Sequence, residues 1–421
     1  MAPGHEHDLD APTMIMTSTP AHVGVRDPDP APLLPQSARR RQVPWRTIRR
    51  AFFYAFLAFL LMLGYSLGRA MTRPTTESAS AKLAEWGRDH HLGFAVTWLE
   101  KVQYDLHPPK KGGDLKGGIR VGDGTTGPAP SAVPTRVVVP HSARPAPVPP
   151  VVSPGLPGEG SWDTLVSGKD GLPLVLGTGL RPDTIHTSYQ VGVAWMDPKL
   201  VRFELHPGSV DPGGSWRFAS SLGTPQAQKG LVAAFNAGFR LPGGQSRGGW
   251  YLDGRTVQPL RDGAASFVIY KDGHADIGSW NGDVRMTPGV VAVRQNLDPL
   301  IDHGTINPTV DENNTLAWGF TLGAAKYVPR TGVGVTKDGA IVYAAGLTNT
   351  RTLAEIMKRA GCVRAMELDI NYEWAVYDYF TRVNAGGVTG LIPHKLTPDQ
   401  QQPADHYLGT SSRDFFAVYA R

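Results

Sequence analysis

The chain has 421 residues, a formal net charge of +5 and a single cysteine, Cys362. One cysteine excludes an intramolecular disulfide, so the folded part must be stabilised by a sizeable core. The excess positive charge is concentrated in six arginines between residues 39 and 50, directly before an apolar run. Because no stripe of basic and aromatic residues occurs elsewhere, nucleic acid is excluded as an expected partner.

The apolar run lies between Arg50 and Arg69 and contains no charged residue. Its length predicts a transmembrane anchor at residues 47–70. The arginine excess before it places the N-terminus in the cytoplasm and the C-terminal domain outside the cell membrane, as in a single-pass signal-anchor protein. A cleaved signal peptide is the alternative, since Ala79-Ser80-Ala81 resembles a cleavage site, but the length of the run favours a retained anchor.

Three further segments flank this anchor. Residues 1–46 lack apolar periodicity and are predicted to form a disordered cytoplasmic tail. Residues 71–107 are predicted to form a helical stalk, because apolar residues at 77–106 follow helical spacing, and this stalk offers a surface for a membrane partner. Residues 108–160 form a Pro/Gly-rich linker, and residues 161–421 form the extracytoplasmic domain.

Short apolar runs separated by Asp-Gly or Asn-Gly pairs dominate residues 161–421. The run at 332–336, for example, precedes Lys337-Asp338-Gly339. Such spacing is typical of β-hairpins. One helix is predicted at 353–360, with a capping box formed by Thr352 and Glu355 and a stop at Gly361, followed by a strand at 362–369. The fold class is therefore predicted as α+β, a β-rich single domain with few helices.

The predicted strand at 362–369 carries two carboxylates, Glu367 and Asp369. Alternate residues of a strand point to the same face, so these groups are candidates for the acid and base of glycosidic hydrolysis. Metal-binding and nucleotide-binding motifs are absent from the sequence, so neither a metal nor a cofactor is expected.

Several segments of the domain, in this order, are similar to the phosphodiester glycosidase family. The resemblance covers residues 230 to 420 and is carried by Phe235-Asn236-Ala237-Gly238-Phe239, Arg330-Thr331, the run at 332–339, Leu353-Ala354-Glu355, Ala365-Met366-Glu367-Leu368-Asp369 and Ser412-Arg413. It implies a hydrolase whose substrate is a sugar phosphodiester or a related cell-envelope carbohydrate.

The resemblance also implies roles for four residues. Asp369 is the expected acid or base, or the group that orients the reacting group; Arg330 and Arg413 are the groups that neutralise the phosphodiester, and Asn236 is a partner of sugar hydroxyls. Glu367 or Glu373 is a second candidate carboxylate, one that this sequence has gained. Guanidinium suits phosphate because its donors match two phosphate oxygens at once.

One departure from the family pattern concerns the residues after the acidic strand. The family has Asn-Leu-Asp followed by glycines, whereas this chain has Glu367-Leu368-Asp369-Ile370-Asn371. Ile370 is β-branched and unsuited to positive φ, so we expect a different turn and no backbone nest for phosphate. A non-catalytic glycan-binding or scaffolding envelope protein with the same fold is therefore the alternative function.

Overall fold

The computed structural model describes residues 44–115, 117–122, 140–241, 246–312, 314–319, 327–385 and 388–421. The predicted tail, up to residue 43, and residues 123–139 of the predicted linker lie outside these ranges. Two compact units are distinguished, Met1–Leu61 and Met62–Arg421. In the first unit, the described residues belong almost entirely to the start of helix α1, and the second unit contains every strand.

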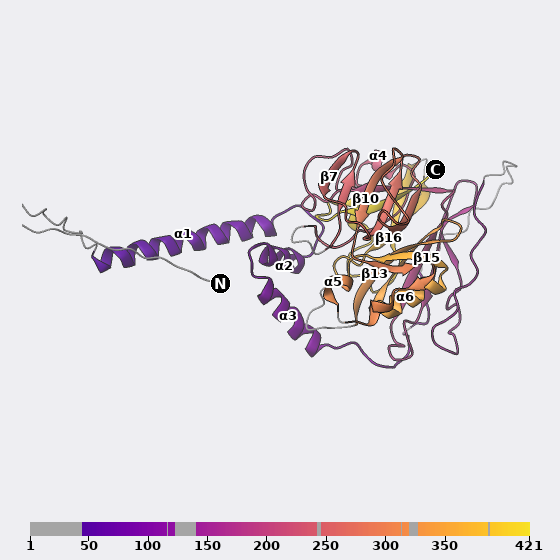
Figure 1. Cartoon of the computed structure of the whole chain (residues 1–421), viewed down its shortest axis with the longest axis horizontal. Helices are drawn as coiled ribbons and strands as arrows, with labels where there is room; N and C mark the ends of the chain where they lie inside the picture. Colours follow the sequence, from indigo (N-terminus) through magenta and orange to yellow (C-terminus); the bar gives the residue numbers. More distant parts are fainter. Residues whose placement is uncertain are drawn as a thin grey trace, which may run out of the picture. The chain divides into compact units, whose positions relative to one another are not determined.

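The first helices of the chain precede the strands (Figure 1). They are α1 (Trp45–Met71), α2 (Ala79–Asp89) and α3 (Gly93–Leu106). In the part of the chain that the structure describes, α1 is the one helix long and apolar enough to cross a membrane. Ser78 caps the start of α2, since its hydroxyl accepts a hydrogen bond from the main-chain N–H of Ala81.

Three antiparallel sheets make up the β-rich body, which confirms the predicted α+β class. The first has the order β1-β2-β3-β14-β13-β15-β11-β12, the second β7-β6-β10-β8-β9, and the third β17-β16-β5-β18-β4. Strands of the first sheet are β1 (Asp163–Ser167), β2 (Pro173–Leu180), β3 (Val191–Met196), β11 (Pro299–Asp302), β12 (Thr305–Ile306), β13 (Val328–Thr336), β14 (Ile341–Thr348) and β15 (Cys362–Glu367).

The strands of the second sheet are consecutive in the chain, and those of the third come before and after them. The second sheet contains β6 (Trp250–Leu252), β7 (Arg255–Gln258), β8 (Ala265–Tyr270), β9 (Ala275–Ser279) and β10 (Val290–Gln295). The third contains β4 (Val201–His206), β5 (Leu231–Asn236), β16 (Tyr377–Ala385), β17 (Val388–Lys395) and β18 (Phe415–Ala420). Short helical turns occur between β4 and β5 at α4 (Pro225–Gln228) and between β17 and β18 at His406–Leu408. Two more, Pro308–Asp311 and α5 (Thr315–Trp318), lie between β12 and β13 of the first sheet.

The main core lies between the three sheets. Alternate residues of β14 divide between two clusters: Ile341 and Tyr343 join the cluster shared by all three sheets, whereas Val342 and Ala344 face α6 (Thr350–Arg359). Figure 1 shows α6 beside β15, and its packing against β13, β14 and β15 covers the first sheet on that face.

The start of α6 differs from the predicted capping box. The helix begins at Thr350, three residues before the predicted start, and its cap is Asn349, whose side chain accepts from the main-chain N–H of Thr352 at 2.7 Å. The predicted cap at Thr352 is therefore wrong, because Thr352 already lies in the first helical turn. The predicted stop is confirmed, since Gly361 follows the helix with φ +92°.

The described parts of the Pro/Gly-rich stretch contact the domain. Val148 is buried, and its main-chain N–H donates to the carbonyl of Gly160 at 2.8 Å. Glu159 forms an ion pair with Arg181 in which the closest N and O atoms lie 2.8 Å apart. Residues 140–160 thus lie along the first sheet and add to its core.

Candidate functional site

A small cavity lies where three segments that are distant in sequence come together. Its volume is about 10 Å³, the size of a single water molecule. The lining residues come from the end of β5, from the loop after β15 and from the segment that precedes β18: Asn236, Ala237, Gly238, Asp369, Trp374, Tyr407, Ser411, Arg413 and Asp414. Of the six residues predicted for the site, three line this cavity: Asn236, Asp369 and Arg413.

The pairing of the strands explains why these segments meet. Phe415, the first residue of β18, pairs with Asn236, the last residue of β5, so Arg413 and Asp414 lie beside the end of β5. The loop after β15 is joined to β13 because the N–H of Thr331 donates to the carbonyl of Asp369 at 3.2 Å. The Nδ2 group of Asn236 donates to the hydroxyl of Thr331 at 2.9 Å and connects the two sheets.

Arg413 is the central cation of the site and is almost completely buried. Its guanidinium lies 3.2 Å from Oδ2 of Asp369, 3.4 Å from Oε1 of Glu85 and 3.7 Å from Oδ2 of Asp211, and it lies over the ring of Trp374. Burial alone lowers the pKa of Arg413, but these carboxylates outweigh it and the net pKa is raised. Arg413 therefore carries a permanent positive charge, surrounded by three acids.

Asp369 is the predicted acid or base, and its carboxyl group lines this cavity. Burial raises its pKa above the ordinary value, although the positive charge of Arg413 and the hydrogen bond from the N–H of Asn371 oppose the rise. A carboxyl group whose pKa is raised towards neutrality is suited to donate and accept protons. Asp369 thus lies at the cavity with a pKa that burial shifts upwards.

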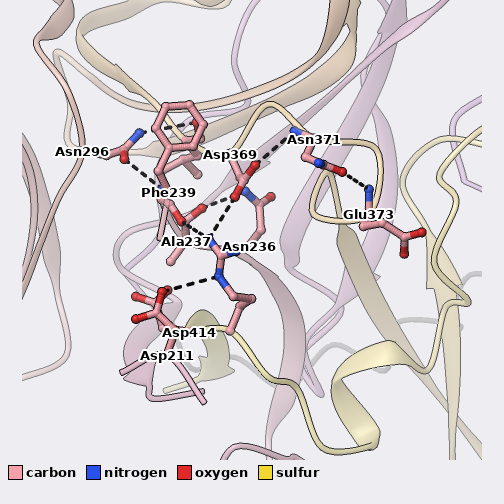
Figure 2. A network of polar contacts seen from close by, with 12 residues as sticks. Asp211, Asn236, Ala237, Phe239, Asn296, Asp369, Asn371, Glu373 and Asp414 are labelled. Atoms are coloured by element: carbon pink, nitrogen blue, oxygen red, sulfur yellow. Dashed lines mark hydrogen bonds and ion pairs between the residues drawn. The ribbon is translucent and has the colours of Figure 1, made fainter. Parts of the chain in front are cut away.

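The loop after Asp369 is built from two consecutive turns in which a side chain accepts from the main chain. Oδ1 of Asp369 accepts from the N–H of Asn371, and Oδ1 of Asn371 accepts from the N–H of Glu373, each at 3.0 Å (Figure 2). None of residues 369–374 has positive φ. The turn is therefore formed by side-chain acceptors and not by glycines with positive φ, as the sequence predicted. Ile370 is buried against Phe239.

Asn236 is held in one orientation by three hydrogen bonds. Besides donating to Thr331, its Nδ2 donates to the carbonyl of Ala237 at 2.9 Å, and its Oδ1 accepts from the hydroxyl of Tyr343 at 2.8 Å. At Gly238 a Cβ atom would lie 2.7 Å from the side chain of Asn296, so only glycine allows this approach. The wall of the cavity at the end of β5 is consequently rigid.

Asp414 lines the cavity, but its charge is already neutralised by Arg294. Nε of Arg294 donates to its Oδ2 at 2.7 Å, and the indole N–H of Trp250 donates to the same oxygen at 3.0 Å. Burial raises the pKa of Asp414, and the charge of Arg294 opposes the rise. Because both partners are fully buried, we interpret the Arg294–Asp414 pair as the floor of the site.

The other three predicted site residues do not line the cavity. Arg330 forms a buried ion pair with Glu367, and burial raises the pKa of Glu367 although the charge of Arg330 opposes this. Strand β15 ends at Glu367, two residues before the predicted end, so the predicted strand through Asp369 is too long. Glu373 accepts from Ser78 and from Gln402, each at 2.5 Å, and holds neighbouring segments together.

A covering segment, residues 76–89, contacts the edge of the site. The N–H of Thr76 donates to the carbonyl of Thr410 at 3.0 Å, and Oε1 of Glu77 accepts from the N–H of Ser412 at 2.6 Å. Glu85, on α2, occupies one end of the Arg413 guanidinium. In this arrangement two carboxylates of the covering segment lie against the donors beside the cavity.

One group of three potential metal-binding side chains occurs among the described residues: Asp283, Asp302 and His303. Asp302 and His303 are exposed, and Nε2 of His303 lies 3.0 Å from Oδ1 of Asp283. The guanidinium of Arg364 also approaches that Oδ1, at 3.8 Å. The arrangement is that of a surface ion-pair group, and none of its members lines the cavity.

Several residues of the site were not found by sequence reasoning. Asp414 directly follows Arg413 and carried a usable signal, because an acidic residue at the start of a buried strand needs a partner. Tyr407 lies in a short helical turn, Asp211 lies outside the named strands, and Glu85 lies in the predicted stalk, so no sequence pattern connects them to the cavity. Trp374, five residues after Asp369, also lines the cavity.

The comparisons with known proteins agree with the resemblance found in the sequence. Residues 229–369 match the family model described as phosphodiester glycosidase, and this confirms the resemblance to that family. Asn236 and Asp369 lie inside the matched range, whereas Arg413 lies beyond it. The search of curated proteins found no match.

Solved structures with a related arrangement are remote. One is the catalytic domain of zebrafish N-acetylglucosamine-1-phosphodiester alpha-N-acetylglucosaminidase, auto-inhibited by its pro-peptide. It is 16% identical to this chain, the match covers 62% of this chain and 88% of the zebrafish chain, and the TM-score is 0.41. A hypothetical protein from Synechocystis is 13% identical, with coverages of 60% and 63% and a TM-score of 0.34. A putative exported protein from Burkholderia pseudomallei is 12% identical, with coverages of 55% and 74% and a TM-score of 0.28.

Proposed function

We propose that this protein is a membrane-anchored, extracytoplasmic hydrolase that cleaves a glycosyl phosphodiester of a cell-envelope glycan. The observation that carries the proposal is the convergence of Asp369, Arg413 and Asn236 on one buried cavity. The match to the phosphodiester glycosidase model over residues 229–369 supports the reaction class. The length and apolarity of α1 support the anchor, and the arginines before it support a cytoplasmic N-terminus.

The proposed reaction adds water to the anomeric carbon of the sugar and breaks the bond from that carbon to the phosphate oxygen. In its protonated form, which burial favours, Asp369 donates its proton to the departing phosphate oxygen. The resulting carboxylate then accepts a proton from the attacking water. The products are a free sugar and a phosphomonoester, and Asp369 returns to its protonated form.

Arg413 supplies the charge stabilisation that this reaction needs. A phosphodiester carries one negative charge, which becomes more localised as the phosphomonoester departs, and a guanidinium stabilises it through two parallel hydrogen bonds. Oδ1 of Asn236, which accepts one hydrogen bond from Tyr343, has a second lone pair for a sugar hydroxyl, and Trp374 offers an aromatic face. Arg330 and Glu367 neutralise each other and stabilise the sheet beneath the site.

Access to this site requires the covering segment to move. A cavity of about 10 Å³ admits no sugar ring, and Glu85 occupies the guanidinium end that a phosphate oxygen would use. Glu77 likewise occupies the N–H of Ser412. Both carboxylates resemble the phosphate in charge, so the covering segment competes with substrate for the same donors.

The decisive experiment measures turnover by the purified full chain in detergent. Methyl phosphodiesters of hexose and N-acetylhexosamine 1-phosphates, in both anomeric forms, serve as substrates, and ³¹P NMR distinguishes diester from monoester. The proposal requires release of monoester and free sugar by the wild type and its loss in Asp369→Asn. Saturable diester binding without turnover would instead establish the alternative, a non-catalytic glycan-binding protein.

A further inference from the structure

Helix α3 has its apolar side chains on the outside of the protein. Phe94 is 75% exposed, Trp98 65%, Leu99 61% and Leu106 69%, and no residue of α3 is buried. Their spacing places all four within about 140° of the helix circumference, at 100° per residue. These four residues form the apolar stripe of α3. A contiguous exposed stripe of large apolar side chains marks a surface that contacts something else.

The side of α3 that faces α2 contains a charged contact. Glu100 forms an ion pair with Arg88 of α2 at 2.8 Å, and this pair joins the two helices as a hairpin. Lys101 and Asp105, both exposed, pair with each other at 2.5 Å beside the apolar stripe. A surface helix in water normally turns its large apolar side chains towards the protein, so the exposure of Phe94, Trp98, Leu99 and Leu106 indicates a contact outside the described domain.

The hairpin contacts the last part of α1. The indole N–H of Trp86 donates to the hydroxyl of Ser66 at 3.1 Å, and Nε2 of His90 lies 2.9 Å from the same hydroxyl. The rings of Trp86 and His90 stack with their centroids 4.5 Å apart. The hydroxyl of Ser66 thus contacts both α2, through Trp86, and the turn between α2 and α3, through His90.

The position of Ser66 in α1 locates this turn relative to a bilayer. Ser66 belongs to the uncharged stretch that ends before Arg69, and three residues of helix rise only about 4.5 Å. When α1 spans a membrane, Ser66 therefore lies at the outer boundary of the hydrocarbon region. The residues that bind it lie at the same depth, and α3 begins three residues after His90.

We propose that α3 lies on the outer surface of the bilayer, with its apolar stripe inserted between the lipid headgroups. This inference rests on the proposed anchor, because it takes its depth from Ser66. A surface helix rich in Trp, Phe and Leu suits the boundary of headgroups and acyl chains. The charged groups of α3 are paired with one another or with Arg88, so the attraction is apolar and zwitterionic lipids are sufficient.

The stripe favours lipid over a second protein because of its place in the chain. α3 is joined through a short turn to residues that bind the end of the membrane span, so the bilayer surface is within reach in every copy of the protein. The exposed Leu83 and Leu92 extend the apolar surface onto α2 and the turn.

The single native cysteine makes a direct test possible. Cys362 is buried and does not react with a label, because burial also raises the pKa of its thiol. The full chain is reconstituted, one copy per disc, in phosphatidylcholine nanodiscs after a nitroxide is attached to Trp98→Cys or Leu106→Cys. Phe56→Cys in α1 reports on the anchor, and Thr256→Cys in the exposed β7 reports on water. Collisions with oxygen and with a water-soluble nickel chelate are then measured.

The proposal predicts that labels at 98 and 106 meet oxygen more often than nickel, as the label at 56 does, whereas the label at 256 shows the reverse. Aqueous labels at 98 and 106 together with a lipid-exposed label at 56 overturn the surface helix and leave the anchor intact. An aqueous label at 56 overturns the anchor itself, and labels at 98 and 106 that are protected from both reagents indicate a protein contact instead. Turnover is measured on the same samples, so hydrolase activity is judged separately.

Discussion

Removing one charge from the covering segment should open the candidate site. Glu85 is mostly buried, and its Oε1 lies 3.4 Å from Nη1 of Arg413. This separation corresponds to about 5 kcal/mol of Coulomb attraction at an effective dielectric constant of about 20. Desolvation offsets most of this, and hydrogen bonds to charged groups contribute roughly 1.5–3 kcal/mol net. Because Arg413 keeps two other carboxylates, we use the lower end, about 1.5 kcal/mol.

Glu85→Gln keeps the shape of the side chain and removes its charge. When the covering segment competes with substrate, a loss of about 1.5 kcal/mol raises kcat/KM about tenfold, mainly through a lower KM. The assay is steady-state hydrolysis of the sugar phosphodiester, with inorganic phosphate as a competitive probe of the freed guanidinium. The inhibition constant for phosphate should decrease by a similar factor.

The matched control is Asp89→Asn on the same helix. Asp89 pairs with Arg240 at 2.7 Å, and neither residue lines the cavity. Asp89→Asn removes an ion pair between α2 and the domain without freeing Arg413, so its KM should remain that of the wild type. Equal effects of the two variants, or an unchanged KM in Glu85→Gln, would refute competition between Glu85 and the phosphate.

Three further outcomes are expected. Asp369→Asn should lower kcat by about 10²- to 10⁴-fold, the usual contribution of a general acid, with an unchanged circular dichroism spectrum; a kcat within a few-fold of the wild type would remove Asp369 from the chemistry. Arg330→Met should lower the free energy of unfolding, measured in urea, by roughly 3–5 kcal/mol because Glu367 is left buried and unpaired. The double variant Arg330→Met with Glu367→Met should regain most of this stability, and its KM should equal that of the wild type. Burial lowers the pKa of His406 to about 4 from 6.5, although Glu77 and Asp405 oppose this. The unfolded chain binds more protons between these values, so neutral His406 contributes fully above pH 6.5 and stability falls by up to about 3 kcal/mol as the pH is lowered to 4. His406→Gln should lack this part of the pH dependence in urea unfolding.

The β-hairpins of the domain could be predicted from the sequence because the residues that form their turns are adjacent in the chain. Asp338-Gly339 stands between β13 and β14, and Asp272-Gly273 stands between β8 and β9, where two short strands must reverse direction. The start of α6 was predicted wrongly because two residues suited to cap a helix, Asn349 and Thr352, lie three positions apart. Asn349 is the cap and receives the N–H of Thr352, so the Thr352–Glu355 pattern lies one turn inside the helix.

The site was harder to predict because its members depend on how the sheets pair. Asn236 and Arg413 were found through the family resemblance, and the register of β5 with β18 explains why they meet. Arg330 and Glu367 looked equally suitable in sequence, yet Glu367 pairs with Gly332 of the adjacent strand, two residues from Arg330, and the two charges neutralise each other. A sequence gives the charge of each residue but not the partner that the fold supplies.

The chain between residues 140 and 160 sets a limit on where the protein can be shortened. Arg181 is held by Glu159 and by the carbonyls of Val152 and Pro154, and the indole of Trp162 donates to the carbonyl of Ala146. A version that starts at residue 161 would strip a nearly buried guanidinium of every one of these acceptors. A shortened version that keeps these contacts must therefore begin at or before residue 140.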